Sequence, residues 1–354
     1  MTTPAPTSTT SAPSAVPTVV PIDDIDRARW DRLLRRTSAA TPFSSWSFHR
    51  AWWDAYGAGA EPHYLSVGPE ADVGIMPLMA RVTGDAQRGR RYFAASFHAD
   101  YATALAADSD VDTVARATVD HLADRNDWTV LDLRRFRADD AFLARLEAIA
   151  SQRADELGWR VRREQEDICP ALPLAASWDE QLARLSKKTR HEVRRKLRRA
   201  QAAGPLRLRY LPLDAAAADR FIELHQARWG PHGLFASGEV GTRSRRFLHR
   251  LVELEGAQAE PAFHIAETVV GDRVIHVAAG FAAGGTCYFY NAGMDPDALE
   301  LSPGVVGTAL YIRDRIARGE KRFDFLRGDE PYKYEWGATD QLLYRLVIEP
   351  REAA

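Results

Sequence analysis

Hydrophobic and polar positions in the first half of the chain alternate between strand-like and helix-like periods. Apolar residues at every second position indicate strands, and apolar residues three or four positions apart indicate helices. We therefore expect a helix at 43–56, a strand pair at 64–67 and 73–82, a helix at 111–125, a strand at 129–133 and a helix that ends before Gly158. This half is predicted to be α/β or α+β.

The second half shows the same mixture of patterns with longer helices. It opens with the segment 168–174. The expected elements that follow are helices at 187–203, 215–229, 242–254 and 305–318, and strands at 206–211, 263–268, 274–282, 287–292 and 323–326. Ser186 is a suitable N-cap for the helix at 187–203, and Gly204 with Pro205 ends it. A mixed sheet flanked by helices is predicted here as well.

A helix followed by a strand that carries Asp and then Arg occurs in both halves. The two strands contain Asp132 with Arg134 and Asp324 with Arg327. An internal duplication and a chance match both explain this order.

The length of 354 residues fits two domains. We expect a disordered tail rich in Thr, Pro, Ser and Ala at 1–20, an N-terminal domain at 21–165 and a C-terminal domain at 166–354, each with its own core. The tail has neither the basic start nor the apolar run of a signal peptide, and no segment approaches the roughly 18 apolar residues of a membrane span. The expected location is the cytoplasm.

Composition excludes several classes of site. Lys and Arg number 47 against 49 Asp and Glu, and a net charge of -2 gives the whole chain no attraction to nucleic acid or membranes. Cys169 and Cys287 have no neighbours at metal-ligand spacing, so we expect neither a disulfide framework nor a metal.

Positive charge is nevertheless concentrated in the helix at 187–203. Its basic residues are Lys187, Lys188, Arg190, Arg194, Arg195, Lys196, Arg198 and Arg199. They cover more than one helix face, so some are ordinary solvated charge. The others predict a polyanion as partner: the 3′-phosphate of CoA, a nucleotide-linked sugar, a lipid-linked acceptor or a tRNA.

The segment 301–308 predicts an anion site at the start of a helix. Pro303 suits the first helical turn, and Gly304 and Gly307 leave room for a pyrophosphate near unpaired backbone N–H groups. The spacing alone equally fits an ordinary capped helix with a glycine packing contact. The corresponding segment of the first half, 108–112, has three Asp residues and no Gly, so only the second half is expected to bind the phosphates.

Residues 323–337, Phe-Asp-Phe-Leu-Arg-Gly-Asp-Glu-Pro-Tyr-Lys-Tyr-Glu-Trp-Gly, closely resemble the closing signature of CelD-type acyltransferases, which are relatives of the FemAB peptidyltransferases. The segments 185–190, 224–229 and 302–304 agree with that family in order and spacing. The resemblance covers roughly residues 165–340 well and the N-terminal half loosely. It implies an α/β (α+β) fold of tandem GNAT-like domains, each a mixed β-sheet flanked by helices, with a degenerate first domain on the acceptor side.

The resemblance also implies an acyl thioester, usually acetyl-CoA, that lies against the strand before the Ser-Pro-Gly turn. Backbone N–H groups at a strand bulge are expected to stabilise the oxyanion of acyl transfer. The cofactor-binding candidates are Asn291, Ala292, Gly293, Ser302, Pro303, Gly304, Gly307 and Thr308.

A base must remove a proton from the attacking amine or hydroxyl group. The base candidates are Asp324, Asp329, Glu330 and His225, with Asp329 preferred. Arg327 and Lys333 are further catalytic candidates, and internal salt bridges are the alternative for both. The substrate-binding candidates are Lys188, Arg190, His225, Arg228, Trp229, Tyr332 and Trp336.

These features predict an enzyme, a GNAT-like N- or O-acetyltransferase that moves an acetyl or similar acyl group from acyl-CoA to an amine or hydroxyl group of a cell-envelope or polysaccharide precursor. The chain shows no coiled-coil arm of the kind that some FemAB proteins insert, which favours CoA over aminoacyl-tRNA. A FemAB-like aminoacyl-tRNA-dependent peptidyltransferase is the alternative. A nucleic-acid-binding protein built on the basic helix ranks third, because it leaves the cluster at 327–336 unexplained.

Overall fold

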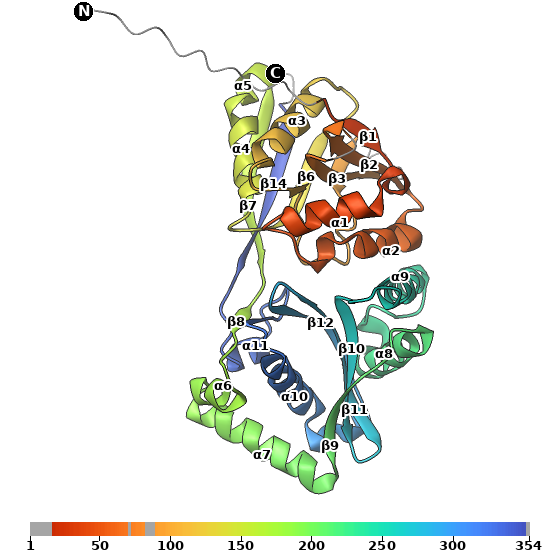
Figure 1. Ribbon diagram of the computed structural model, residues 1–354, viewed down its shortest axis with the longest axis vertical. Helices are drawn as coiled ribbons and strands as arrows, with labels where there is room; N and C mark the ends of the chain where they lie inside the picture. Colours follow the sequence, from red (N-terminus) through yellow and green to blue (C-terminus); the bar gives the residue numbers. More distant parts are fainter. Residues whose placement is uncertain (1–15, 70–71, 82–88, 352–354) are drawn as a thin grey trace, which may run out of the picture.

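The computed structural model describes residues 16–69, 72–81 and 89–351. The strands of its first sheet run in the order β1-β2-β3-β4-β6-β14-β7, and β5 pairs with β3 (Figure 1). Their bounds are β1 Thr18–Val20, β2 Ala60–Val67, β3 Gly74–Arg81, β4 Arg90–Phe93, β5 Leu105–Ala106, β6 Val130–Arg137, β7 Trp159–Ile168 and β14 Leu342–Pro350. The helices of this half are α1 Arg27–Arg36, α2 Trp46–Tyr56, α3 Val111–Ala123, α4 Ala141–Gln152 and α5 Ala154–Leu157.

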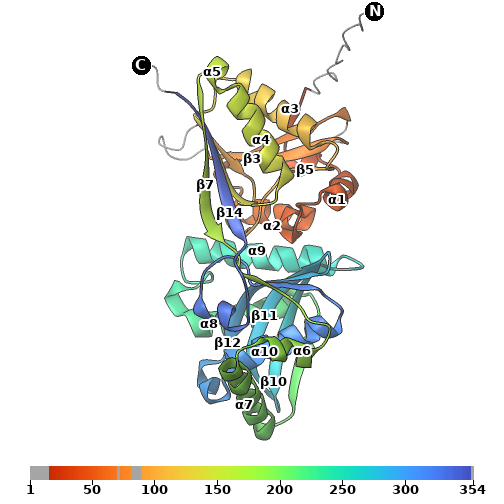
Figure 2. The same ribbon diagram turned by 90° about the vertical axis from the view of Figure 1, so that its left-hand side faces the viewer.

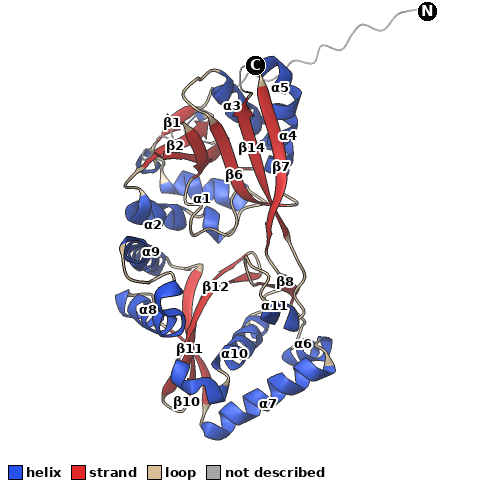
Figure 3. Cartoon of the chain, turned by 180° about the vertical axis from the view of Figure 1, so that it is seen from behind, coloured by secondary structure: helices blue, strands red, loops and turns tan. Residues whose placement is uncertain are grey.

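The second sheet has the order β8-β13-β12-β11-β10-β9. Its strands are β8 Ala171–Pro173, β9 Leu206–Tyr210, β10 Phe263–Val270, β11 Arg273–Ala283, β12 Thr286–Met294 and β13 Arg322–Asp324. Its helices are α6 Trp178–Arg184, α7 Lys187–Ala203, α8 Ala215–Trp229, α9 Glu239–Gly256, α10 Pro303–Ala317 and α11 Pro331–Glu335. Figure 3 shows α8 and α9 on one side of this sheet, and α7 and α10 on the other.

Local sequence signals account for several of these bounds. The hydroxyl of Ser186 accepts a hydrogen bond from the Thr189 backbone N–H at 3.1 Å and caps α7, as expected. The strand expected at 323–326 ends earlier, at Asp324, because the backbone turns at Leu326 (φ 60°) and Gly328 (φ 107°). The expected mixed α/β fold, with two sheets flanked by helices, is confirmed.

Both halves contain a parallel strand pair connected through a helix. In the first half β4 runs parallel to β6, with α3 between them in the sequence. In the second half β12 runs parallel to β13, with α10 between them. The repeated helix–strand order in the sequence therefore has a structural counterpart, as an internal duplication predicts.

The last strand crosses back to the first half. β14 pairs antiparallel with both β6 and β7, so residues 342–350 complete the first sheet rather than the second. β8, which follows β7, pairs with β13 in the second sheet, on the side of the expected boundary to which its residues belong. The domain boundary expected at 165/166 is wrong for β14, because the apolar pattern of a strand does not specify which sheet it joins.

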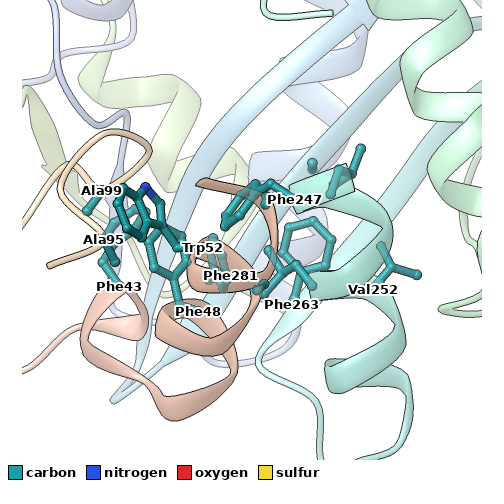
Figure 4. Close-up of a cluster of buried hydrophobic side chains, with 14 of the residues drawn as sticks. Phe43, Phe48, Trp52, Ala95, Ala99, Phe247, Val252, Phe263 and Phe281 are labelled. Carbon is teal, nitrogen blue, oxygen red and sulfur yellow. The ribbon is translucent and has the colours of Figure 1, made fainter. Parts of the chain in front are cut away.

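The two halves also share a hydrophobic core, although separate cores were expected. One cluster lies within the first half and two lie within the second, but the largest joins both. In it, Phe48 of α2 packs edge-to-face on Phe247 of α9 with ring centroids 5.2 Å apart, and Phe43 packs on Phe281 at 5.5 Å (Figure 4). Burial of these aromatic faces fixes the halves against each other.

The tail expected at 1–20 is only partly testable, since residues 1–15 lie outside the described residues. Thr18–Val20 form β1 and pair with Tyr64–Ser66 of β2, so the expectation of disorder is wrong for these residues. No helix in the described ranges is long and apolar enough to cross a membrane.

Candidate active site

A cleft of about 710 Å³ lies in the second half, where β12 and β13 diverge. These parallel strands pair only over Thr286–Tyr288 and Arg322–Asp324. Beyond Tyr288, the edge of β12 that faces β13 has no strand partner among the described residues. The cleft is lined by β12, α7, the end of α8, the start of α10 and the segment 325–336, and Figure 2 gives a second view of these elements.

β12 carries a β-bulge at the cleft. Its register with β11 shifts between Ala279 and Gly280, which pair with Asn291 and Phe289, so Tyr290 is the extra residue. The residues 289–292 all line the cleft. A bulge was expected one to three residues further along, and an unpaired backbone N–H at such a site is available to a ligand.

The expected oxyanion residues have different roles. Asn291 Oδ1 accepts a hydrogen bond from the Ala292 N–H at 2.7 Å, and the Ala292 carbonyl lies 3.4 Å from Trp229 Nε1, which donates to it. Gly293 does not line the cleft, because it lies against α8: a Cβ there would be 2.4 Å from the backbone nitrogen of His225. Gly293 and the buried His225 therefore serve helix–strand packing, which corrects their assignment to ligand binding.

The start of α10 faces the cleft as expected. Ser302 has a φ of 54° and precedes Pro303, the first helical residue. Gly304 and Thr308 line the cleft, and the nearest atom to a Cβ built on Gly304 is the terminal Met294 Cε, at 3.2 Å. Backbone N–H groups in this first turn have no intrahelical partner, so they are available to an anion.

Gly307 has a packing role instead. A Cβ at Gly307 would lie 2.4 Å from the ring of His276, so this glycine lets α10 approach β11 closely. The imidazole of His276 lines the cleft, and burial lowers its pKa to about 3, which keeps it neutral. Arg199 of α7 donates a hydrogen bond to the Ser302 hydroxyl at 2.7 Å and joins α7 to the start of α10.

Lys188, Glu192 and Lys196 of α7 line the cleft. Glu192 is paired with Arg195 at 2.7 Å, whereas neither lysine forms an ion pair within the part of the chain that the structure describes. Arg190, expected to contact substrate, lines a separate groove on the outer side of α7. The cleft therefore offers two ammonium groups without an ion pair among the described residues, and Lys196 is the one closer along α7 to Arg199, which contacts the start of α10.

An aromatic and cationic wall faces these lysines. The Arg228 guanidinium lies over the Trp229 ring, with 4.5 Å between Cζ and the ring centroid, and forms no ion pair with any described residue. Tyr332 is edge-to-face with Phe325, and burial raises its pKa to about 12. With Trp336, these residues line the cleft as expected for substrate contacts.

Lys333 lines the cleft but is committed to the turn after β13. Its buried ammonium donates to the carbonyl oxygens of Leu326, Arg327 and Gly328 at 2.9, 2.7 and 3.0 Å. It also pairs with the Glu330 carboxylate at 2.9 Å. The alternative predicted for this lysine, an internal salt bridge, is the arrangement observed.

Asp324 is a structural residue, which corrects its assignment as a candidate base. Its side chain is 1% exposed and is absent from the cleft. The carboxylate accepts hydrogen bonds from the Tyr101 hydroxyl at 2.7 Å and the Leu326 N–H at 2.8 Å. Burial raises its pKa. It fixes the same turn as Lys333 and links it to the first half.

The other candidates near this turn differ in position. Arg327 lines the cleft, and its guanidinium pairs with Asp100 of the first half. Asp329, the preferred base, is exposed and is not a lining residue of the cleft. Of the four base candidates, only Glu330 lines it.

The first half contacts the cleft region through the segment 98–101. Beside Asp100 and Tyr101, His98 lies 3.3 Å from the Tyr290 hydroxyl at the bulge, and its ring also contacts the Tyr56 hydroxyl at 2.8 Å. All lining residues of the cleft nevertheless come from residues 188–336. The expectation that the first half forms the acceptor side finds no support in this lining.

Sequence reasoning overlooked Glu192, His276, Tyr290 and Glu335 as members of the site, whereas Lys196 belongs to the basic cluster for which a polyanion was predicted. Helical spacing gives a signal for Glu192, since residues 188, 192 and 196 are four apart and share one helix face. His276 and Tyr290 carried no local signal, because their place depends on how β11 and β12 pair. Among the described residues, no three His, Cys, Asp or Glu side chains are grouped as metal ligands.

Residues 187–334 match the acetyltransferase (GNAT) domain family. The match begins at the first residue of α7 and ends within α11, so it contains nearly the whole cleft. The match lies within the second half of the chain. No curated protein matches the chain.

Solved structures share the whole two-unit fold at low sequence identity. The crystal structure of FemX is 10% identical and has a TM-score of 0.62, covering 90% of this chain and 96% of that one. A conserved protein of unknown function from Bacteroides thetaiotaomicron is 13% identical, with a TM-score of 0.60 and coverage of 92% and 98%. The C-terminal domain of a putative lysylphosphatidylglycerol synthetase from Agrobacterium fabrum is 11% identical, with a TM-score of 0.52 and coverage of 92% and 91%.

Proposed function

We propose that the protein is a cytoplasmic, CelD-type acyltransferase that moves an acetyl or similar acyl group from acyl-CoA to an amine or hydroxyl group of a cell-envelope or polysaccharide precursor. The observation that carries the proposal is one cleft, within the GNAT-matched residues, that combines an open strand edge, a helix start and two free lysines. Acyl-CoA supplies an activated carbonyl group and a phosphate-bearing tail.

The residues present fit such a donor. The backbone N–H groups at Gly304 and Val305 and the ammonium groups of Lys188 and Lys196 are suited to the phosphates. The open edge of β12 can hold an extended amide-containing arm by main-chain hydrogen bonds. The backbone N–H of Tyr290, the extra residue of the bulge, is our candidate donor to the carbonyl oxygen.

Proton removal from the acceptor is assigned to Glu330. This carboxylate lines the cleft and is held by Lys333, which also orders the turn beneath it. Arg228, Trp229 and Tyr332 form the wall on which an acceptor would rest. The assignment replaces the preference for Asp329, which the sequence alone favoured.

Calorimetric titration with acetyl-CoA tests the donor. Wild-type protein is expected to bind with micromolar affinity, and Gly304→Glu is expected to abolish binding because it places negative charge at the phosphate site. The matched control is Ala317→Glu, an exposed position about 20 Å further along α10 that should leave binding unchanged.

Absence of acetyl-CoA binding to the wild-type protein would contradict the proposal and favour a FemAB-like, aminoacyl-tRNA-dependent peptidyltransferase. Two observations support that alternative: the likeness of the fold to FemX across 90% of the chain, and the basic surface of α7 beside the cleft. Titration with aminoacyl-tRNA in the same assay separates the two functions.

A further inference from the structure

Helix α7 carries a charge that contrasts with the rest of the chain. It has eight Lys and Arg residues and one Glu, whereas the whole chain has 47 basic and 49 acidic residues. The remainder therefore carries nine more acidic than basic residues. Among the described residues, Arg195 is the only basic residue of α7 that forms an ion pair, and its partner is Glu192 of the same helix.

Part of this charge lies in a line on the outer side of α7. Lys187, Arg190, Arg194 and Arg198, which we call the outer stripe, are three or four residues apart and share one helix face. They line a shallow groove of about 760 Å³ on the helix surface. At about 1.5 Å per residue the stripe is about 16 Å long. None of the four forms an ion pair with a described residue, so the charge of the stripe is available to an external anion.

The position of α7 at one end of the molecule leaves it accessible to an extended flat surface. It forms the outer edge of the second half, at the end of the molecule remote from the first half (Figures 1 and 2). Lys188 and Glu192 line both the outer groove and the cleft, so the groove that the stripe lines adjoins the cleft. A surface in contact with the stripe would lie beside the entrance of the cleft.

The helix chemistry favours a charged surface over nucleic acid bases. α7 contains no Phe, Tyr or Trp that could stack on a base, and His191 is its single ring-bearing side chain; its apolar residues Val193, Leu197 and Ala200 pack against the protein. The acidic remainder of the chain would be repelled by a polyanion, which orients the molecule with α7 towards it. This combination fits electrostatic adsorption to anionic lipid.

We propose that the outer stripe docks the protein on a bilayer that contains anionic phospholipid, with the mouth of the cleft beside the membrane surface. On the function proposed above, the acceptor is then a precursor held at that membrane. The docking itself does not require the proposed activity. The adsorption is peripheral and needs no spanning helix.

Co-sedimentation with vesicles tests the docking. Wild-type protein is expected to bind vesicles of equimolar phosphatidylglycerol and phosphatidylcholine at low salt, to bind phosphatidylcholine vesicles at least tenfold more weakly, and to be released at high salt. The variant Lys187→Gln/Arg194→Gln/Arg198→Gln is expected to bind on the order of 100-fold more weakly. Arg190 is left in place because it also donates to a backbone carbonyl, at 3.2 Å.

The control variant Arg35→Gln/Arg246→Gln/Arg313→Gln removes the same charge from exposed residues that form no ion pair within the described part of the chain. It should bind like wild type, and Arg194→Lys/Arg198→Lys should retain binding because it keeps the charge. Equal weakening of the stripe and control variants, or binding to RNA without binding to anionic vesicles, would overturn the docking proposal. Acetyl-CoA titration of the stripe variant should be unchanged, so failure of docking and failure of the proposed function are distinguishable.

Discussion

Replacing Lys333 with Met tests whether this lysine stabilises the turn after β13 or acts in catalysis. The ammonium is buried and donates to three carbonyl oxygens at 2.7–3.0 Å. Met is unbranched and adaptable, so it fills the space of the lysine stem while it removes charge and donors. The variant therefore isolates the hydrogen bonds from the packing.

The size of the effect follows from the acceptors that lose their donor. A hydrogen bond to a charged group contributes about 1.5–3 kcal/mol, and leaving buried partners unsatisfied costs about 1–3 kcal/mol each. The pair with Glu330 adds little, because that carboxylate is 56% exposed. The turn also contains Leu326 at a φ of 60°, which is unfavourable for a residue other than glycine. We expect Lys333→Met to lower the free energy of unfolding by about 3–5 kcal/mol.

Urea unfolding followed by tryptophan fluorescence measures this loss. Lys321→Met, at an exposed position on the same segment, is the control and should change stability by less than about 0.5 kcal/mol. If Lys333→Met lost less than about 1 kcal/mol of stability but lost activity, the structural role of this lysine would be refuted and a direct catalytic role would be favoured.

Three further predictions test the glycines, the buried histidine between the halves and the base. Gly307→Ala should lower the free energy of unfolding by about 1–3 kcal/mol in thermal unfolding, because its Cβ would lie 2.4 Å from a histidine ring. Gly304→Ala should be near neutral, because its Cβ would meet the flexible end of a methionine at 3.2 Å. Equal losses for the two variants would contradict the assigned roles. Burial lowers the pKa of His98 to about 3. As the pH falls, the imidazole therefore binds a proton in the unfolded chain before it does so in the folded protein, and stability is lost between pH 6.5 and pH 3. The loss is about 2 kcal/mol at pH 5, and a His98→Gln variant should show a smaller fall in unfolding free energy between pH 7 and pH 5 than wild type. Glu330→Gln should retain acetyl-CoA binding in calorimetry and lower the acceptor-dependent release of the CoA thiol at least 100-fold. Unchanged release would exclude Glu330 as the base.

Features with local causes were predictable from the sequence. The helices 187–203 and 215–229 occur at the expected bounds because their periodicity, caps and stop signals all lie within them. The start of α10 faces the cleft as expected for the same reason. The bulge in β12 was expected within a few residues of its observed place, since the resemblance to CelD-type enzymes marked the strand that carries it.

Features that depend on distant partners were not predictable. Gly304 and Gly307 are equivalent in the sequence, yet one faces the cleft and the other a buried histidine, because only the packing of α10 on the sheet separates them. Asp324, Asp329 and Glu330 lie in one motif, and the turn held by Lys333 decides that only Glu330 lines the cleft. The pairing of β14 in the first sheet likewise has no local signature.

The contacts between the halves suggest what the first half contributes. Three polar contacts of the segment 98–101 reach the cleft or the turn beside it. His98 contacts the hydroxyl of the bulge residue, Asp100 pairs with Arg327, and Tyr101 donates to Asp324. The same segment supplies no lining residue. Because the shared aromatic core fixes the halves together and β14 returns the chain to the first sheet, the segment holds the bulge and the turn at a set separation. We infer that the first half supports the site by fixing the width of the cleft.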